Sequence, residues 1–596
     1  MEIYKNMTNV EIADLLRAVS AAYEIQGKKE NRFKIIAYGR AADAVEHSSS
    51  EIKDLWDDGK LEQLAGVGPS IAQHLGEIFT TGKSKHFDEV MGDIPQAVFE
   101  LIKIPGIGPS RAATLVRALK ISSKSPYDDL KKAAEEGRVA KLEGFGEDSQ
   151  AAIMKSLEEY KGRDKDRMML NYAEGRATEV VEWMGQCPEV ERVDTLGSLR
   201  RKASTVGDID IAVATDKPKA VLEHFVNFPK KVRILEKGEK TASIIIPGNL
   251  QIDLMVGPVS QYGALLQHFT GSKHHNIALR EFANKKGWSL SEYGIRKFEA
   301  RSTKSETNSK LKKFKTEEEF YKFLGLEYIP PELREDMGEI EAAQRKAVPS
   351  LVELKDIKAD LQIHTNFDIE TSHDLGESSM EEILDKALAL GYEYVAFTDH
   401  NPSHSRHSKK QIIELIKRRG EKIKVIRHKV KAFNSLEVDI MPDGSLPVPE
   451  EGLELLDFAL VSIHSSFNQS RKEATERVLR AFDNPKVKIF AHPTGRKINE
   501  REGVEFEWPK IFEVCKKRNI WLEVNASPSR LDLPDYLVKE AVDAGVKLTM
   551  GTDAHHAGDM GNMIYAVYTA RRGWAQKNDI INARSLKDFE KFLISN

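Results

Sequence analysis

The chain has 596 residues, which is too many for one hydrophobic core, so we expect three or more domains. Its apolar content of 40% and charged content of 31% are typical of a globular protein, and no stretch is apolar enough to span a bilayer. Cys187 and Cys515 lie far apart in the sequence, which argues against a disulfide framework and a cysteine zinc site. The first residues are not typical of a signal peptide, so we expect a cytoplasmic protein with no membrane partner. The net charge of −4 neither indicates nor excludes nucleic acid as a partner.

The first 165 residues are expected to be helical, and they contain a near-repeat at 64–82 and 104–121, with a looser third copy at 142–160. Each copy joins a glycine-containing turn to a helix rich in small residues. Glycine permits the positive φ angles of a tight turn, and the N–H groups that begin the next helix bind anions. Three ordinary helical hairpins are the alternative, but the repetition favours sequence-independent contacts with a DNA backbone. The glycines expected to make these contacts are Gly66, Gly68, Gly106 and Gly108.

From about residue 166 the pattern changes to strands and helices, and after residue 355 short apolar runs alternate with helical ones, as is typical of a β/α architecture. The stretch before residue 355 is charged and has few apolar residues, so we expect a linker there. The chain therefore divides into six predicted segments, which are 1–88, 89–165, 166–260, 261–333, the linker 334–354, and 355–596.

Three carboxylates mark the first of two predicted chemical sites. Asp208 and Asp210 are two residues apart in GDIDIAV, so both side chains leave one face of a strand, and Asp253 interrupts the apolar run QIDLMV. Carboxylates in buried strands are costly unless a cation compensates them, and their oxygens suit Mg²⁺ bound together with substrate phosphates. The nearby segment GSLRR combines a glycine turn with donors suited to a triphosphate. The residues expected to contact the nucleotide there are Gly197, Ser198 and Arg201.

These motifs resemble those of the family-X DNA polymerases, the polymerase-beta-like group, over residues 1 to about 333. The resemblance implies that Asp208, Asp210 and Asp253 bind two Mg²⁺ or Mn²⁺ ions. It also implies that Asp253 is the general base for the primer hydroxyl, or lies next to it. Gapped or primer–template DNA and dNTPs are the implied partners. The implied domains are a lyase-like helical domain at 1–88, a DNA-binding helix–hairpin–helix subdomain at 89–165, a nucleotidyltransferase palm at 166–260, and a thumb with the nucleotide pocket at 261–333.

The segment HFTGSKHHNIALR resembles the nucleotide-pocket motif of the same family, and EYGIR resembles a part of its thumb. The resemblance implies that Phe269 and Gly271 pack against the sugar of the nucleotide. It also implies that Asn276 contacts the incoming nucleotide and that Arg280 contacts the template strand. His268 stands where the family has a tyrosine, which leaves the discrimination between sugars open.

Some members of this family use the first helical module as a 5′-deoxyribose-phosphate lyase, through a lysine that forms a Schiff base. In this chain His74 stands where that lysine would be, and the nearby Lys34 is interpreted as a phosphate contact. We therefore expect lyase activity to be weak or absent.

Apolar, strand-like runs after residue 355 repeatedly end in residues that bind metals, as in YVAFTDH, FALVSIH, KIFAH and LTMGTDAH. In β/α barrels, the residues at the carboxyl ends of the strands converge on the active site. Histidines mixed with carboxylates suit a cluster of Mn²⁺, Zn²⁺ or Fe²⁺ that makes hydroxide near neutral pH. The alternative is that each histidine is a solvated loop residue, and this is our interpretation of His404, His407 and His428.

The region 355–596 resembles the PHP (polymerase and histidinol phosphatase) domain. The resemblance implies a distorted, TIM-like β/α barrel with a metal cluster. The implied ligands are His364, His400, Glu437, His464, His492, Asp553 and His555. One ligand is missing, because Gln362 replaces the first histidine of the family's opening motif. The next acidic ligand corresponds to Asp368, Glu370 or Asp374, and the run DLGESSMEEI favours Asp374.

We therefore predict a multidomain DNA repair polymerase, with an α-helical helix–hairpin–helix region, an α+β palm and thumb, and a β/α PHP barrel. It would fill short gaps, as in base excision repair, and its PHP domain would act as a metal-dependent 3′-5′ exonuclease that processes 3′ ends. The alternatives are a template-free nucleotidyltransferase acting on RNA ends, a DNA-binding scaffold with an inactive polymerase, and a small-molecule phosphatase. A monomer is expected.

Overall fold

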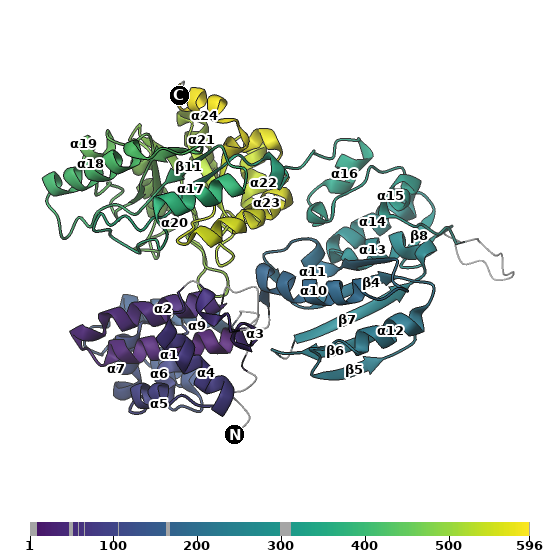
Figure 1. The fold of residues 1–596 in the computed structure, drawn as a ribbon, viewed down its shortest axis with the longest axis horizontal. Helices are drawn as coiled ribbons and strands as arrows, with labels where there is room; N and C mark the ends of the chain where they lie inside the picture. The colour runs from purple at the N-terminus through teal and green to yellow at the C-terminus, as the bar shows by residue number, and fades with distance from the viewer. Residues whose placement is uncertain are drawn as a thin grey trace.

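Figure 1 shows three parts: a helical amino-terminal part, a central part built on a mixed sheet, and a carboxy-terminal part in which helices surround parallel strands. No helix in the described part of the chain is long and apolar enough to cross a membrane. This computed structural model describes residues 7, 9–46, 52–57, 59–64, 66–104, 107–161, 167–248, 250–297 and 311–594.

The helical amino-terminal part has two small cores. In α1, the buried residues Ile12, Leu16 and Val19 recur at helical spacing, so one face of this helix packs against α2 and α5. A second core lies among α6, α7 and α8. Phe99 of α6 packs with Ala22 of α1 and thereby joins the two cores. The helices are α1 (Asn9–Ile25), α2 (Arg32–Glu46), α3 (Ile52–Asp57), α4 (Pro69–Thr81), α5 (Lys85–Met91), α6 (Gln96–Leu101), α7 (Pro109–Leu119), α8 (Pro126–Glu135) and α9 (Glu147–Lys161).

The central part is built on a five-stranded sheet of order β2-β4-β7-β6-β5, in which β4 and β7 are parallel and the other pairs are antiparallel. Alternate residues of β4 serve two cores, because Ile211 and Val213 face α10 and α12 while Ala212 and Ala214 face α13. The elements are β1 (Met168–Met169), α10 (Leu170–Gly185), β2 (Arg192–Thr195), α11 (Gly197–Arg200), β3 (Thr205–Val206), β4 (Ile209–Ala214), α12 (Pro218–Val226), β5 (Arg233–Lys237), β6 (Thr241–Ile246) and β7 (Leu250–Gly257).

The segment that follows forms a separate core around α14 and α15. The stretch 334–354, predicted as a linker, is folded: it contains α16, whose Ile340 and Ala343 pack in the same core as Phe320 of α15. Its few apolar residues are enough for this, because they fall on one side of a short helix. The elements are α13 (Tyr262–Thr270), α14 (Lys273–Lys285), β8 (Trp288–Ser291), β9 (Gly294–Lys297), α15 (Glu317–Leu324) and α16 (Glu339–Gln344).

The carboxy-terminal part contains two parallel sheets, β10-β11-β12 and β13-β14-β15-β16-β17. Two bridges connect these sheets into a ring of strands that follow one another in chain order. His400, just after β11, pairs with Glu437 of β13, and Ile363 of β10 pairs with Ala554, just after β17. Short buried strands that alternate with helices produce this arrangement. The strands are β10 (Ala359–Ile363), β11 (Tyr394–Phe397), β12 (Lys431–Asn434), β13 (Glu437–Asp439), β14 (Ala459–Ser462), β15 (Val487–Phe490), β16 (Trp521–Asn525) and β17 (Leu548–Gly551).

Two hydrophobic clusters hold this ring together. In β11, Tyr394 and Ala396 belong to a cluster shared by most of the strands, whereas Val395 and Phe397 pack in the cluster formed with the helices. Phe589 of α24 joins the first cluster. The helices are α17 (Met380–Ala389), α18 (Lys409–Val425), α19 (Glu450–Leu453), α20 (Arg471–Ala481), α21 (Trp508–Arg518), α22 (Asp535–Ala544), α23 (Met563–Arg572) and α24 (Leu586–Ile594).

Helix α23 lies against the central part of the chain. Tyr565 and Tyr568 of this helix pack against the core formed by α10 and the mixed sheet. Lys202, which follows α11, lies with its ammonium group 4.6 Å from the centre of the Tyr568 ring. The amino-terminal part also touches the carboxy-terminal part, because Arg40 of α2 donates a hydrogen bond to the carbonyl of Leu375 at 3.2 Å.

Two candidate active sites

The three predicted catalytic carboxylates meet on one face of the mixed sheet. Asp210 of β4 and Asp253 of β7 are direct partners in the parallel register of these strands. Asp208 precedes Asp210 by two residues, and the period of a strand places both on the same side. This side faces α13, because Ala212, two residues after Asp210, packs against that helix. The isoleucines next to the carboxylates, Ile209, Ile211 and Ile252, are buried in the hydrophobic core with α10 and α12.

Among the described residues, no basic side chain is a cause of the pKa shift of Asp210. Burial raises the pKa of Asp210 to about 7, and the neighbouring carboxylates of Asp208 and Asp253 add to this effect. Asp253 is held by neutral donors, the Ser243 hydroxyl and the Gln251 amide, whose nitrogen lies 3.0 Å from each carboxylate oxygen. Three clustered carboxylates offer only oxygen ligands, which fit hard divalent cations such as Mg²⁺ or Mn²⁺.

In the metal-free protein, Asp210 is expected to reduce stability as the pH rises. Its ordinary pKa is near 3.8 and its folded-state pKa is about 7, so the folded chain binds this proton more tightly and stability is lost between about pH 4 and pH 7. Asp210→Asn should therefore raise the free energy of unfolding at pH 8 by roughly 1–3 kcal/mol and have little effect at pH 4. Urea denaturation in EDTA measures this, and a lower stability of the variant at pH 8 would contradict it.

The predicted triphosphate-binding turn lies beside the carboxylates. Gly197 has a φ of 56°, and a Cβ added there would lie 3.4 Å from a carboxylate oxygen of Asp210. This close approach suits a glycine at the start of α11. Arg201 donates its Nη1 to the carbonyl of Thr270 at 2.6 Å and its Nε to Glu335 at 2.9 Å. Ser198 lies in the same short helix, α11. The turn and the pocket motif are therefore in contact.

The predicted nucleotide pocket begins at the end of α13. Phe269 is 36% exposed, and its ring contacts the edge of His268, with the ring centres 4.8 Å apart. Asn276 is oriented by two hydrogen bonds of 2.8 Å, one donated to the His268 carbonyl and one accepted from Gln267. Gly271 lies against Arg201, because a Cβ added there would be 3.1 Å from its Nη1. The exposed side chain of Arg280 projects from α14, in the next part of the same segment.

Sequence reasoning missed the groups that support this pocket from behind. His275 is fully buried and contacts Glu339 at 2.6 Å. Arg334 is also fully buried, and its guanidinium contacts Glu317 at 2.6 Å. Because two of these residues lie in the stretch predicted as a linker, its composition gave no signal for them.

The predicted backbone-binding turns have the expected local structure. Gly68 and Gly108 each occupy the position before a helix, α4 and α7, and proline follows in the first turn of each. Neither helix start is capped by its own N-cap side chain, so backbone N–H groups are presented there. Gly66 has a φ of 85° and lies close to the Arg40 carbonyl. Gly106 lies outside the described residues.

His74 lies in a cluster of aromatic rings. Its ring stacks on His86 with centres 4.4 Å apart, and His86 in turn contacts the Tyr23 hydroxyl at 2.8 Å. Burial lowers the pKa of His86, and the nearby charges of His74 and Lys34 act in the same direction. Lys34 lies over the Tyr23 ring at 4.9 Å. The position where some family members have the lyase lysine is thus occupied by a stacked imidazole.

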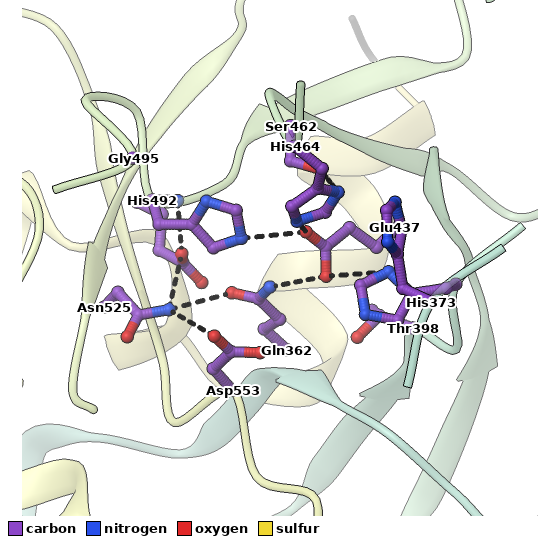
Figure 2. Close-up of polar contacts among 12 residues, drawn as sticks. Gln362, His373, Thr398, Glu437, Ser462, His464, His492, Gly495, Asn525 and Asp553 are labelled. Atoms are coloured by element: carbon purple, nitrogen blue, oxygen red, sulfur yellow. Dashed lines mark hydrogen bonds and ion pairs between the residues drawn. The ribbon is translucent and has the colours of Figure 1, made fainter. Parts of the chain in front are cut away.

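The second site lies where the strands of the carboxy-terminal ring end. Figure 2 shows the Glu437 carboxylate between His492, whose Nε2 lies 2.8 Å away, and Gln362, whose amide donates a hydrogen bond of 2.9 Å. Candidate ligand atoms, which are histidine nitrogens and carboxylate oxygens, lie within 4.8 Å of one another in four overlapping groups. These groups are His364–His400–His555, His373–Asp439–His464, His400–Glu437–His464 and His364–Glu437–Asp553.

Two members of these groups were missed, and two expected residues, Asp374 and His492, are in none of the groups found among the described residues. His373 and Asp439 were not predicted, although their side chains contact each other at 2.9 Å. Asp374, the residue favoured from the sequence, nevertheless acts on His555: burial and the charge of His364 lower the pKa of His555, and the charge of Asp374 opposes this shift. Glu370 contacts His407 at 2.8 Å, and the Asp368 carboxylate accepts a hydrogen bond from the Glu370 backbone.

The electrostatics of this site also fit a metal cluster. Although burial opposes it, hydrogen bonds to Asp553 and Glu437 raise the pKa of His364 to about 10, so a proton takes the place of a cation there. The Nδ1 atoms of His364, His400 and His492 are buried without a hydrogen-bond partner among the described residues. Buried polar atoms of this kind are costly, and coordination to a metal would satisfy them.

Gln362 occupies the position where the resemblance predicts a histidine. It is fully buried, donates to Glu437 and accepts a hydrogen bond of 3.2 Å from Asn525. Asn525 in turn donates a hydrogen bond of 3.1 Å to the buried carboxyl of Glu523. Burial raises the pKa of Glu523 well above its usual range. A neutral amide network therefore fills this side of the site.

Comparison with known proteins identifies the family. The chain is 33% identical over 595 residues to the DNA polymerase/3′-5′ exonuclease PolX of Bacillus subtilis (strain 168), covering 99% of this chain and 100% of that protein. The chain belongs to the family-X DNA polymerases. This family-X chain also matches the DNA polymerase beta thumb at residues 265–335, a helix–hairpin–helix domain at 7–84 and a SAM-like helix–hairpin–helix tandem at 98–159. The predicted family, helical modules and thumb are thereby confirmed.

Two other relatives match separate portions of this family-X chain. Rat DNA polymerase lambda is 24% identical over 355 residues, which cover 55% of this chain and 56% of that protein. A probable phosphatase of Thermoanaerobacter sp. (strain X514) is 27% identical over 236 residues, which cover 38% of this chain and 91% of that protein. The phosphatase match falls in the carboxy-terminal part.

Proposed function

We propose that this family-X enzyme fills short gaps in DNA by templated, two-metal nucleotidyl transfer, and that its carboxy-terminal PHP domain is a metal-dependent 3′-5′ exonuclease. The observation that carries the proposal is the pairing of Asp210 with Asp253 on neighbouring parallel strands, with Asp208 on the same side. The two activities in the name of the Bacillus subtilis relative, DNA polymerase and 3′-5′ exonuclease, support both halves of the proposal. The domain boundaries predicted above are part of the proposal, except that the stretch 334–354 packs with the thumb segment and is not a linker.

In the palm, the proposed roles follow from the contacts. Asp208, Asp210 and Asp253 would hold two divalent cations, which when bound activate the primer hydroxyl and neutralise the leaving pyrophosphate. Asp253, oriented by Ser243 and Gln251, is placed to accept the hydroxyl proton at a carboxylate oxygen. Ser198, Gly197 and Arg201 would orient the triphosphate. Phe269 and Gly271 would contact the sugar, Asn276 the nucleotide, and Arg280 the template strand.

In the PHP domain, the buried histidines and carboxylates would hold Mn²⁺, Zn²⁺ or Fe²⁺, which when bound supply hydroxide for phosphodiester cleavage. Glu437 contacts several of the histidines and is the central ligand of the proposal. We add His373 and Asp439 to the predicted ligands because both belong to a metal-compatible group, and Asp374 remains a candidate for the acidic position. The other proposed ligands are His364, His400, His464, His492, Asp553 and His555.

A labelled primer in a duplex with a one-nucleotide gap tests both activities in one reaction. Each dNTP is supplied separately with Mg²⁺ or Mn²⁺, and Asp208→Ala and His492→Ala run beside the wild type. We expect addition of only the templated nucleotide, lost in Asp208→Ala, and shortening of the primer, lost in His492→Ala. Addition without regard to the template would instead favour a template-free transferase. No addition under either metal would favour the scaffold interpretation.

Gln362→His is expected to increase the metal content of the PHP domain. The substitution replaces a neutral amide near the end of β10 with a ligand nitrogen. Its neighbours are Glu437, which the amide contacts, and Asp553, whose backbone N–H donates to the Gln362 carbonyl. We expect up to about one additional Mn²⁺ per chain, measured by mass spectrometry of the metals after dialysis, with faster primer shortening. Asn525→His is the control, because Asn525 is the residue that donates a hydrogen bond to the Gln362 amide oxygen. Equal metal content of Gln362→His and wild type would show that Gln362 does not occupy a ligand position.

A further inference from the structure

Arg572, the last residue of α23 in the carboxy-terminal part, reaches the triphosphate-binding turn of the palm. Its Nη1 donates to the backbone carbonyl of Arg201 at 2.8 Å and lies 3.0 Å from Oε1 of Glu335. The same Oε1 atom accepts the Nε–H of Arg201 at 2.9 Å. The side chain of Arg572 is 9% exposed, and that of Arg201 is 14% exposed. One carboxylate oxygen is therefore shared by two arginines from different parts of the chain.

Arg572 is itself held in place from its own side. Asp535, the first residue of α22, accepts the Nε–H at 2.7 Å and contacts Nη2 at 2.6 Å. Although burial opposes it, Asp535 and Glu335 raise the pKa of Arg572, so this side chain stays charged. Both nitrogens meet the same oxygen, Oδ2 of Asp535, so one edge of the planar guanidinium is held in place. Asp535 thus holds the Arg572 guanidinium in place, and the third nitrogen, Nη1, is directed at Glu335 and the Arg201 carbonyl.

The contacts of Arg201 define what this sharing controls. Its Nε is used by Glu335 and its Nη1 by the Thr270 carbonyl, and no hydrogen bond among the described residues uses Nη2. A triphosphate and a carboxylate compete for the same guanidinium, because both accept paired N–H donors. When Arg572 also binds Glu335, part of the negative charge of this carboxylate is neutralised. Arg201 is then oriented by Glu335 without being held so strongly that it cannot bind phosphate.

We propose that Arg572 of the carboxy-terminal domain is a positioning residue for nucleotide binding by Arg201 in the palm. This inference rests on the proposed polymerase function. It adds that the carboxy-terminal domain contributes to nucleotide affinity in the palm as well as carrying its own site.

Arg572→Ala tests the inference in full-length protein. Without Arg572, Glu335 pairs with Arg201 alone and competes with the triphosphate, so we expect the KM for the templated dNTP to rise roughly tenfold while kcat changes less than about threefold. The double variant Arg572→Ala/Glu335→Gln removes the competing charge, and its KM should return to within about threefold of the wild type. Primer shortening by the PHP domain reports whether that domain is still folded.

Arg571→Ala is the matched control. Arg571 also joins the two parts of the chain, through Glu332 at 2.8 Å and the Val352 carbonyl at 3.1 Å, but it does not contact Arg201 or Glu335 in the described structure. Its KM should stay near that of the wild type. An equal rise of KM in both single variants would overturn the inference in favour of loosened domain contact. An unchanged KM in Arg572→Ala, or no recovery in the double variant, would overturn it as well.

Two further arrangements keep the test decisive. If Arg572→Ala melts below the assay temperature, Arg572→Lys is used: it keeps the charge but has one nitrogen for three partners, so we expect KM to rise roughly two- to fivefold. If the wild type adds no nucleotide, the proposed function fails. The inference is then tested separately, by calorimetric titration of dNTP with Ca²⁺ into the complex with gapped DNA. Equal dissociation constants for the wild type and Arg572→Ala would overturn it.

Discussion

Asp253→Asn is expected to lower templated nucleotide addition by roughly a thousandfold or more, which corresponds to about 4 kcal/mol of transition-state stabilisation. Asparagine has nearly the same shape and can keep a hydrogen bond to Ser243, so the fold of β7 should be retained. What is lost is one of the negative charges that balance the cations, together with the expected acceptor of the primer hydroxyl proton. Single-turnover addition to a gapped duplex measures the effect.

The control for this substitution is Asp194→Asn. Asp194 lies in β2 of the same sheet and accepts a hydrogen bond of 2.8 Å from the Tyr262 hydroxyl, but it is not part of the triad. Nucleotide addition by Asp194→Asn should stay within about threefold of the wild-type rate, because the substitution removes a charge that is not one of the proposed metal ligands. Primer shortening should be normal in both variants. Nucleotide addition by Asp253→Asn at more than a tenth of the wild-type rate would show that the chemistry does not depend on this carboxylate.

Glu437→Gln is expected to abolish primer shortening, with a loss of roughly a hundredfold or more, and to reduce the bound Mn²⁺. Glu437 is fully buried and contacts His364 at 3.3 Å, His464 at 3.2 Å and His492 at 2.8 Å. Despite its burial, the surrounding histidines hold its pKa well below the usual range, so it carries the negative charge on which the cluster depends. Glutamine keeps the volume and removes that charge.

Glu523→Gln is the matched control for this substitution. Glu523 is buried in the middle of β16, and burial raises its pKa well above the usual range, which favours the neutral form that glutamine imitates. Replacing it with the neutral amide should therefore change metal content and primer shortening by less than about threefold. Nucleotide addition in the palm should be unaffected in both variants. If Glu437→Gln retained full metal content and shortening, the cluster at the strand ends would not be the nuclease site.

The site residues that are easiest to predict from the sequence lie within, or at the end of, an apolar run that forms a strand. Asp208, Asp210 and Asp253 interrupt apolar runs, and a carboxylate in such a run is recognisable without a structure. The strand-terminal His464 and His492 were recognisable in the same way. In the structure these two histidines both contact Glu437.

Residues that reach a site from a distant segment were not predictable in this way. His373 comes from a loop, and its contact with Asp439 depends on how that loop folds back over the ring. The charged composition of 334–354 predicts a linker, but in the structure Glu339 of this stretch pairs with the buried His275. A charged residue that is paired in the folded chain looks the same in the sequence as one that is solvated. Local composition therefore could not reveal them.

The contact of α23 with the palm links two stretches of sequence that are otherwise free to diverge. Glu335 pairs with Arg201 on one side and Arg572 on the other, so its charge suits a chain that keeps both. A descendant that lost the carboxy-terminal domain would expose the surface now covered by Tyr565 and Tyr568 and would leave Glu335 acting on Arg201 alone. We expect such a lineage to replace Glu335 early. Domain loss in this family would then leave a trace at a single position of the polymerase.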